Sequence, residues 1–208
     1  MRTRRVNDVA SLLEPGAAGW DAAGFEPVAM MPAPLAMQPT EYIRVKWEGR
    51  EYGSDPGLKV ASVHDGKRWV LCARWSGVSP SGIDFPDAIA VALPVRNDPP
   101  LILMGMDGAP IQYLRWQSNK PALRSIVATG IGHSENGPKM AAMSVKAHTN
   151  GEQWDVVMSR SLGGEGEVAP LLAGQKTKIG FAVWRGANEE RGGIKAFSID
   201  WIELALDA

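Results

Sequence analysis

The sequence predicts an all-β fold, an antiparallel β-sandwich formed by a single domain with few short helices. Short alternating or apolar runs recur along the chain, and turn-forming residues separate them at short intervals. Two of the separators, Asp65-Gly66 and Asn150-Gly151, supply the positive φ angles that two-residue hairpin turns require. Only residues 6–13 approach the spacing of apolar residues that a helix would show. Such a series of strands and turns is typical of two sheets packed face to face.

The expected strands follow one another closely along the chain. Their residues are alternating or β-branched, and glycine, proline, asparagine or aspartate commonly marks their ends. The strands are expected over residues 42–48, 58–64, 67–75, 87–95, 101–104, 111–116, 122–129, 140–148, 153–159, 176–184 and 197–206.

The N-terminal part of the chain has a different composition. Residues 15–40 are rich in proline, glycine, alanine and methionine. Each proline removes a backbone donor and biases the preceding residue toward extended geometry, so a long helix is excluded. We therefore expect an irregular arm over residues 1–40, packed on the core, and a β-sandwich domain over residues 41–208.

The composition of the 208 residues excludes several classes of protein. Lys plus Arg is 22 and Asp plus Glu is 23, so the net charge of −1 gives no indication of a nucleic-acid partner. No run of about 18 apolar residues indicates a membrane-spanning helix. The single cysteine, Cys72, excludes an internal disulfide, a cysteine-ligated iron–sulfur cluster, a zinc–thiolate site and c-type haem attachment. Cys72 itself is expected to be a small buried apolar residue rather than a reactive thiol.

The common catalytic motifs are absent from the sequence. His64, His133 and His148 are far apart and lack the spacing of metal-binding histidines. There is no nucleophile elbow and no phosphate-binding loop, and no pair of carboxylates indicates acid–base chemistry. We therefore expect no catalytic residue on this chain.

Two segments carry less common patterns. In residues 101–116 a strand is expected to end in Met104-Gly105-Met106, turn, and return through Trp116. In residues 181–198 a strand is expected to end at Trp184, and a loop dense in glycine and charge leads to Lys195.

These segments resemble the haem b (gamma) subunit of the ethylbenzene dehydrogenase and dimethylsulfide dehydrogenase group. That group is the type II branch of the dimethyl sulfoxide reductase family of molybdenum enzymes. The central Met-Gly pair of the family matches Met104-Gly105, and residues 31–37 are also similar to the ethylbenzene side of the group. Ala196 departs from the pattern, because a serine often follows the lysine in the family. The C-terminal signature is matched by Phe181-Ala182-Val183-Trp184, Gly186, Asn188, Glu190-Arg191, Gly193 and Lys195.

The resemblance implies a noncovalently bound haem b. In the family a methionine sulfur and a lysine amine hold the iron, and the motifs place these ligands at Met104 and Lys195. Met106 stays a competing candidate, because it has the same chemistry, and a strand would point both methionines to one face. Without the resemblance, the usual positions of these residue types in proteins would make Met104 a core side chain and Lys195 a solvated lysine.

The implied ligands make physical sense. A lysine binds iron as the neutral amine, and burial beside a porphyrin and a positive iron disfavours the ammonium form. Gly192 and Gly193 would let the backbone approach the ring closely. Trp116 and Trp184 either wall the pocket or belong to the core. Three arginines are candidates for the haem propionates, and the sequence does not choose among them: Arg115, Arg185 and Arg191.

The resemblance also implies a function and partners. The chain would be the non-catalytic electron-transfer subunit of a heterotrimer, with a molybdopterin-containing alpha subunit and an iron–sulfur beta subunit. Electrons would pass from the clusters to the haem, and then to an external acceptor such as cytochrome c. The implied enzyme is of the ethylbenzene- or steroid-side-chain-hydroxylating type. A periplasmic location is implied, and because no leader is recognisable here, we expect export in the folded state with a signal-bearing partner.

A second function from another class fits the same fold. The sandwich is similar in architecture to carbohydrate-binding modules, in which exposed tryptophans stack on sugar rings without haem. A fold does not decide between these functions.

Overall fold

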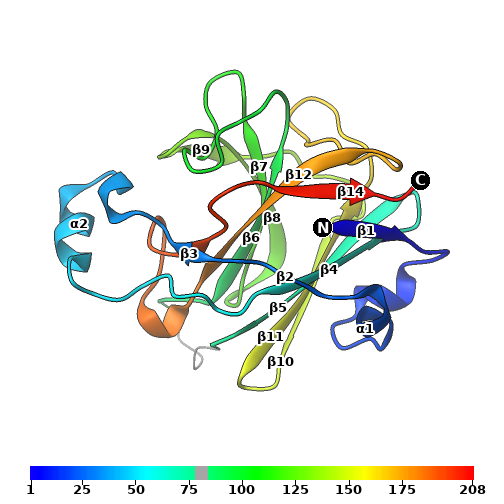
Figure 1. The fold of residues 1–208 in the computed structure, drawn as a ribbon, viewed down its shortest axis with the longest axis horizontal. Coiled ribbons are helices and arrows are strands. Elements are labelled where there is room, and N and C mark those ends of the chain that lie inside the picture. The colour runs from blue at the N-terminus through cyan, green and yellow to red at the C-terminus, as the bar shows by residue number, and fades with distance from the viewer. Residues whose placement is uncertain (78–83) are drawn as a thin grey trace.

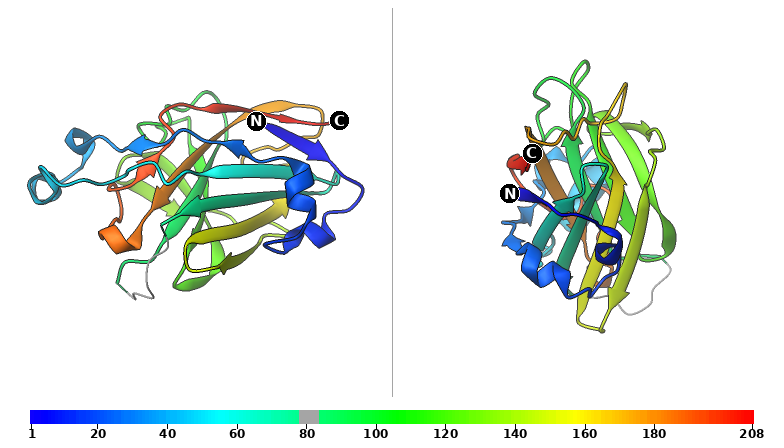
Figure 2. Two further views of the ribbon diagram at one scale, coloured as in Figure 1. Left: turned by 60° about the horizontal axis from the view of Figure 1, so that its bottom comes forward. Right: turned by 90° about the vertical axis from the view of Figure 1, so that its right-hand side faces the viewer.

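The computed structural model describes residues 1–77 and 84–208, which form two β-sheets packed against each other (Figures 1 and 2). The helical elements are η1 (Ala10–Leu13), α1 (Gly19–Ala23), η2 (Leu35–Met37), α2 (Glu41–Trp47) and η3 (Gly186–Asn188). The strands are β1 (Arg2–Arg5), β2 (Glu26–Pro27), β3 (Met31–Pro32), β4 (Lys59–His64), β5 (Arg68–Ser76), β6 (Ala88–Pro94), β7 (Ile111–Gln117), β8 (Lys120–Gly130), β9 (His133–Asn136), β10 (Ser144–Thr149), β11 (Gln153–Ser161), β12 (Lys176–Trp184), β13 (Ala196–Phe197) and β14 (Ile202–Leu206).

One strand connects the two sheets. The first runs β10-β11-β5-β4-β1-β14-β12, and the second runs β12-β6-β7-β8-β9. The first half of β12 pairs with β14 and its second half with β6. A strand shared in this way turns the corner of a sandwich.

The predicted all-β sandwich fold is confirmed. Both predicted hairpins form, β4 with β5 and β10 with β11, and the glycines of their turns have φ values of 87° at Gly66 and 94° at Gly151. The ladders are antiparallel except at β1, which lies parallel to both β4 and β14.

Residues 42–48, predicted as a strand, instead belong mainly to helix α2. The side chain of Thr40 accepts a hydrogen bond from the amide of Ile43, and Glu41 lies in the first turn, so the segment begins like a capped helix. Only Trp47 of α2 is buried, while Tyr42 and Val45 are exposed. The alternation of apolar residues over 42–48 therefore does not indicate a strand, because no neighbouring strand pairs with this segment.

Two further strand predictions need correction. Residues 101–104 form a turn, and residues 197–206 are interrupted between β13 and β14. The turn is closed by the amide of Met104, which donates to the carbonyl of Leu101 at 3.0 Å. Because the segment is not a strand, the expectation that Met104 and Met106 share one strand face is wrong.

The core lies between the sheets, and strand β6 shows how the two faces of its sheet differ. Ile89, Val91 and Leu93 point into the main apolar core, where Trp75 and Trp116 pack edge to face with their ring centroids 6.2 Å apart. The first three alternate residues of β6, which point to the other face, are alanines: Ala88, Ala90 and Ala92. Large residues thus fill the core side of the sheet, and small ones leave space on its outer side.

Cys72 on β5 is fully buried in an apolar cluster, as predicted. Burial raises the pKa of its thiol to about 12. We expect native protein at pH 8 to react with Ellman's reagent on the order of 1,000-fold more slowly than protein unfolded in guanidinium, because only opened molecules expose the thiol. Equal rates in the two conditions would contradict this assignment.

The N-terminal arm begins with β1, which lies within the first sheet between β4 and β14, and then runs along the outside of the sandwich. Figures 1 and 2 show α1 and α2 at opposite ends of the molecule, with α2 projecting beyond the strands. Between them, β3 pairs with β13 through Pro32 and Ala196, which attaches the arm to the second sheet. Across the described ranges, no helix combines the length and the apolar character that crossing a membrane requires.

Candidate functional site

A cavity of about 400 Å³ lies on the outer face of the second sheet, in the size range of small-molecule and cofactor sites. Its floor includes Ala90 and Ala92 of β6 and Ala182 of β12. The arm and the start of α2 form one wall through residues from Ala33 to Ile43. The remaining walls are the turn that carries Met104, the turn at Ile131 and Gly132, and the loop that ends at Lys195.

Met104 reaches this cavity from the turn between β6 and β7. Its φ of 61° is unusual for a residue other than glycine, and this conformation costs on the order of 1 kcal/mol or more. The next residue, Gly105, packs so closely that a Cβ there would lie 2.7 Å from the carbonyl oxygen of Ala128. The turn is therefore held by its surroundings in the conformation that directs Met104 into the cavity.

Met106 does not reach the cavity. Its backbone pairs with that of Ala109 in a tight turn, and its side chain is 52% exposed. Of the two methionines that the sequence left in competition, the structure brings only Met104 to the cavity.

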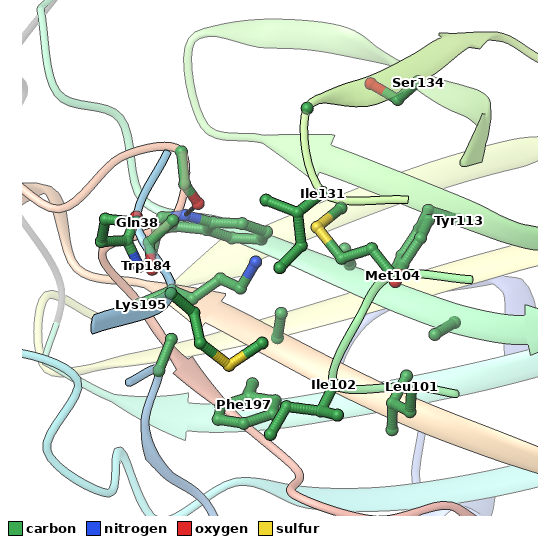
Figure 3. Close-up of a pocket in the computed structure, with 18 of the residues that line it drawn as sticks. Gln38, Leu101, Ile102, Met104, Tyr113, Ile131, Ser134, Trp184, Lys195 and Phe197 are labelled. Carbon is green, nitrogen blue, oxygen red and sulfur yellow. Dashed lines mark hydrogen bonds between the residues drawn. The ribbon is translucent and has the colours of Figure 1, made fainter. Parts of the chain in front are cut away.

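Lys195 enters the cavity from the opposite side. Its carbonyl oxygen accepts a hydrogen bond from the amide of Ala33, and β13 begins at the next residue, so its backbone is fixed between the arm and the sheet. Figure 3 shows the side chains of Lys195 and Met104 pointing toward one another across the cavity. The predicted ligand pair, which comes from distant parts of the sequence, thus faces one space.

The amine of Lys195 has an apolar environment. It lies 5.4 Å from the centre of the Trp184 ring, and no described residue hydrogen-bonds or ion-pairs with it. Burial, and secondarily the charge of Arg115, lower the pKa of Lys195 to about 8. The neutral amine, the form that binds metals, is therefore far more accessible than in a solvated lysine.

A buried carboxylate organises the loop before Lys195. Glu190 accepts hydrogen bonds from the amides of Gly53 and Arg185, both at 2.9 Å, and from the side chain of Asn188. Gly53 in turn packs against the lysine backbone, because a Cβ there would lie 2.5 Å from the carbonyl oxygen of Lys195. Glu190 thus connects the loop to the segment that supports Lys195.

The arm is joined to the same loop by Gln38. Its amide group donates to the carbonyl oxygen of Gly193 at 3.1 Å, and the side chain lies where a Cβ on Gly193 would be. The other predicted glycine, Gly192, accepts a hydrogen bond from the indole nitrogen of Trp184 at 3.0 Å. Both glycines line the cavity. Their contacts with Gln38 and Trp184 fix the position of the loop that forms this wall of the cavity.

The other candidate residues separate into two groups. Trp184 and Arg115 line the cavity, with the guanidinium 5.0 Å from the ring centre. Trp116 belongs to the core. Arg185 lies 3.6 Å from the carboxylate of Glu190, and Arg191 is exposed over the ring of Phe85.

Several cavity residues were not predicted. Gln38 and Tyr113 line the cavity but belong to neither of the two motifs. The alanines of the floor did have a signal, because residues 88–93 alternate alanine with a large apolar residue. Such an alternation indicates a strand with one packed face and one face that leaves room.

Histidines and carboxylates do not form a metal site in the described ranges, where no three His, Cys, Asp or Glu side chains cluster. His64 is buried and accepts a hydrogen bond from the amide of Gly66, while His133 and His148 are exposed. The metal donors among the residues that line the cavity are instead the thioethers of Met104 and Met37, the amine of Lys195 and the phenol of Tyr113.

The chain is similar to subunits of oxidoreductases. It is 35% identical over 122 residues to chlorate reductase subunit gamma of Ideonella dechloratans, covering 58% of this chain and 50% of that protein. It is 25% identical over 178 residues to dimethylsulfide dehydrogenase subunit gamma of Rhodovulum sulfidophilum, covering 81% and 67%. It is 30% identical over 151 residues to a Haloferax mediterranei protein named as a respiratory nitrate reductase heme subunit, covering 69% and 54%.

The chain is a homologue of these gamma subunits. The resemblance inferred from the two motifs is therefore confirmed. The matched region of this gamma-subunit homologue spans about half to two thirds of the relatives' own lengths. No family profile matches the chain.

Solved structures support the fold of the gamma-subunit homologue. A protein described as carbohydrate-binding from Bacteroides uniformis superposes with a TM-score of 0.51 at 12% identity, covering 100% of this chain and 98% of the other. A family 9 carbohydrate-binding module from Caldicellulosiruptor kristjanssonii, in complex with cellotriose, gives 0.50 at 9% identity, covering 100% and 93%. At these identities the likeness shows a shared β-sandwich and nothing about ligands.

Proposed function

We propose that the chain is an electron-transfer subunit that binds one haem b noncovalently, with Met104 and Lys195 as the axial ligands of the iron. The observation that carries this proposal is the convergence of these two side chains on one cavity (Figure 3). Haem b supplies a reversible one-electron couple of its iron.

The residues of the cavity fit such a group. Its lining is largely apolar, and alanines leave space over the sheet. A thioether is a soft ligand that raises a haem potential, and a partly buried amine with a lowered pKa is a suitable second donor. Because protein side chains would occupy both axial positions, the site suits electron transfer rather than binding of oxygen or substrate.

The proposed partners follow from the homology. The named relatives are subunits of a chlorate reductase, a dimethylsulfide dehydrogenase and a nitrate reductase. We propose that this chain likewise joins a molybdopterin-containing alpha subunit and an iron–sulfur beta subunit, and passes electrons to an acceptor such as cytochrome c. In this proposal catalysis occurs on the alpha subunit, of the ethylbenzene- or steroid-side-chain-hydroxylating type, and the complex is periplasmic.

A haem titration of the wild-type chain tests the cofactor. We expect saturation at one haem per chain and, after reduction, the visible spectrum of a six-coordinate low-spin b-type haem. In Ala90→Phe, a ring fills the floor of the cavity, and binding should weaken by on the order of 100-fold because the cofactor no longer fits. A wild-type chain that takes up no haem but binds cellooligosaccharides in calorimetry would support the carbohydrate-binding alternative and overturn the proposal.

A further inference from the structure

One charged group in the cavity has no counterion. Arg115 projects from β7 beside Trp184, and its Nε is buried without a hydrogen-bond partner among the described residues. The described lining includes no aspartate or glutamate, and its only other charged side chain is Lys195. Buried charges in proteins are normally paired, because desolvating an unpaired charge is costly.

We propose that Arg115 binds a carboxylate of the ligand, and, resting on the proposed function, that this carboxylate is a haem propionate. A guanidinium presents two parallel N–H groups that match the two oxygens of a carboxylate. The guanidinium carbon lies 5.0 Å from the centre of the Trp184 ring, and a contact with a ring face takes up no hydrogen-bond acceptor.

The other two candidate arginines are placed differently. Arg185 already lies 3.6 Å from a carboxylate oxygen of Glu190, and it does not line the cavity. Arg191 is exposed and lies over the ring of Phe85. Of the three arginines that the sequence offered, Arg115 alone is both in the cavity and without an anionic partner.

The test compares haem with its dimethyl ester, which keeps the iron and the ring but has no carboxylate charge. Wild type should bind haem about 10- to 100-fold more tightly than the ester, the range expected for a charge-assisted hydrogen bond. Arg115→Gln should remove this preference while keeping the six-coordinate spectrum. Arg115→Lys should restore part of it, because the charge returns without the planar fork. Arg191→Gln is the matched control and should keep the full preference.

The outcomes separate this inference from the proposed function. A six-coordinate haem in Arg115→Gln with an undiminished preference overturns the role of Arg115 and leaves the haem proposal standing. A preference lost in Arg191→Gln also overturns it. Equal binding of haem and its dimethyl ester by the wild type would overturn the inference by itself. The test therefore does not depend on whether the Arg115 variants fold. If wild type binds neither, both proposals fall.

Discussion

Met104→Ala is expected to abolish the six-coordinate haem spectrum, and Met106→Ala is expected to leave it unchanged. Met104 lines the cavity opposite Lys195, whereas Met106 lies in the adjoining turn with its side chain 52% exposed. Removing the thioether leaves one axial position open, so the reduced variant should bind carbon monoxide, which the wild type should not. Haem affinity should fall on the order of 10- to 100-fold or more, because loss of a ligand costs at least as much as loss of the groups that orient one.

Lys195→Ala provides the complementary experiment. The alanine removes the amine and leaves space beside Trp184. An added small primary amine should therefore occupy that space and restore the low-spin spectrum in Lys195→Ala, but not in Met104→Ala. A six-coordinate spectrum that survives in either alanine variant without added ligand would contradict the assignment of that residue.

Glu190→Ala should cause the largest loss of stability of any single change in the loop. The carboxylate is fully buried and accepts from two backbone amides and from Asn188. Its removal leaves buried donors unpaired and the guanidinium of Arg185 without its partner. We expect the free energy of unfolding to fall by about 3–5 kcal/mol and Tm to fall by roughly 10 °C, as measured by calorimetry on the haem-free chain.

The adjacent Glu189 is the matched control. Its carboxylate is about half exposed and lies 3.7 Å from Arg50 and 4.0 Å from Lys46, so Glu189→Ala should change stability by less than about 1 kcal/mol. Because Glu190 also holds Gly53 against the backbone of Lys195, haem binding should weaken in Glu190→Ala at temperatures where the variant is still folded. Equal melting temperatures for the two variants would show that the buried carboxylate has no structural role.

The sequence predicted the sandwich because its signals are local. Hairpin turns at Gly66 and Gly151 depend on residues next to each other, and the alternation of alanine with larger apolar residues along β6 separates its packed face from the face that leaves room. The segment at α2 misled because seven residues with scattered apolar side chains fit either period, and the capping contact of Thr40 decides the outcome.

The candidate ligands were predicted from a motif, but the backbone conformation and the contacts that position them were not. Local spacing gave no reason to prefer Met104 over Met106, because the distinction rests on a positive φ at Met104 and on close packing at Gly105. Similarly, the hydrogen bond from Gln38 to Gly193 joins two positions that are far apart in the sequence. Contacts between such distant positions depend on the assembled fold, and a single sequence does not reveal them.

The pairing of the N-terminal arm with the last third of the chain sets the order of events during synthesis. On the ribosome, β1 and β3 emerge early but must wait for β14 and β13, and the carbonyl of Lys195 that Ala33 binds arrives later still than the floor of the cavity. A nascent chain stopped before Lys195 therefore has neither the amine of that residue nor a closed wall around the cavity. In the proposed function, cofactor uptake thus follows synthesis of the segment around Lys195, when the arm and that segment first come together.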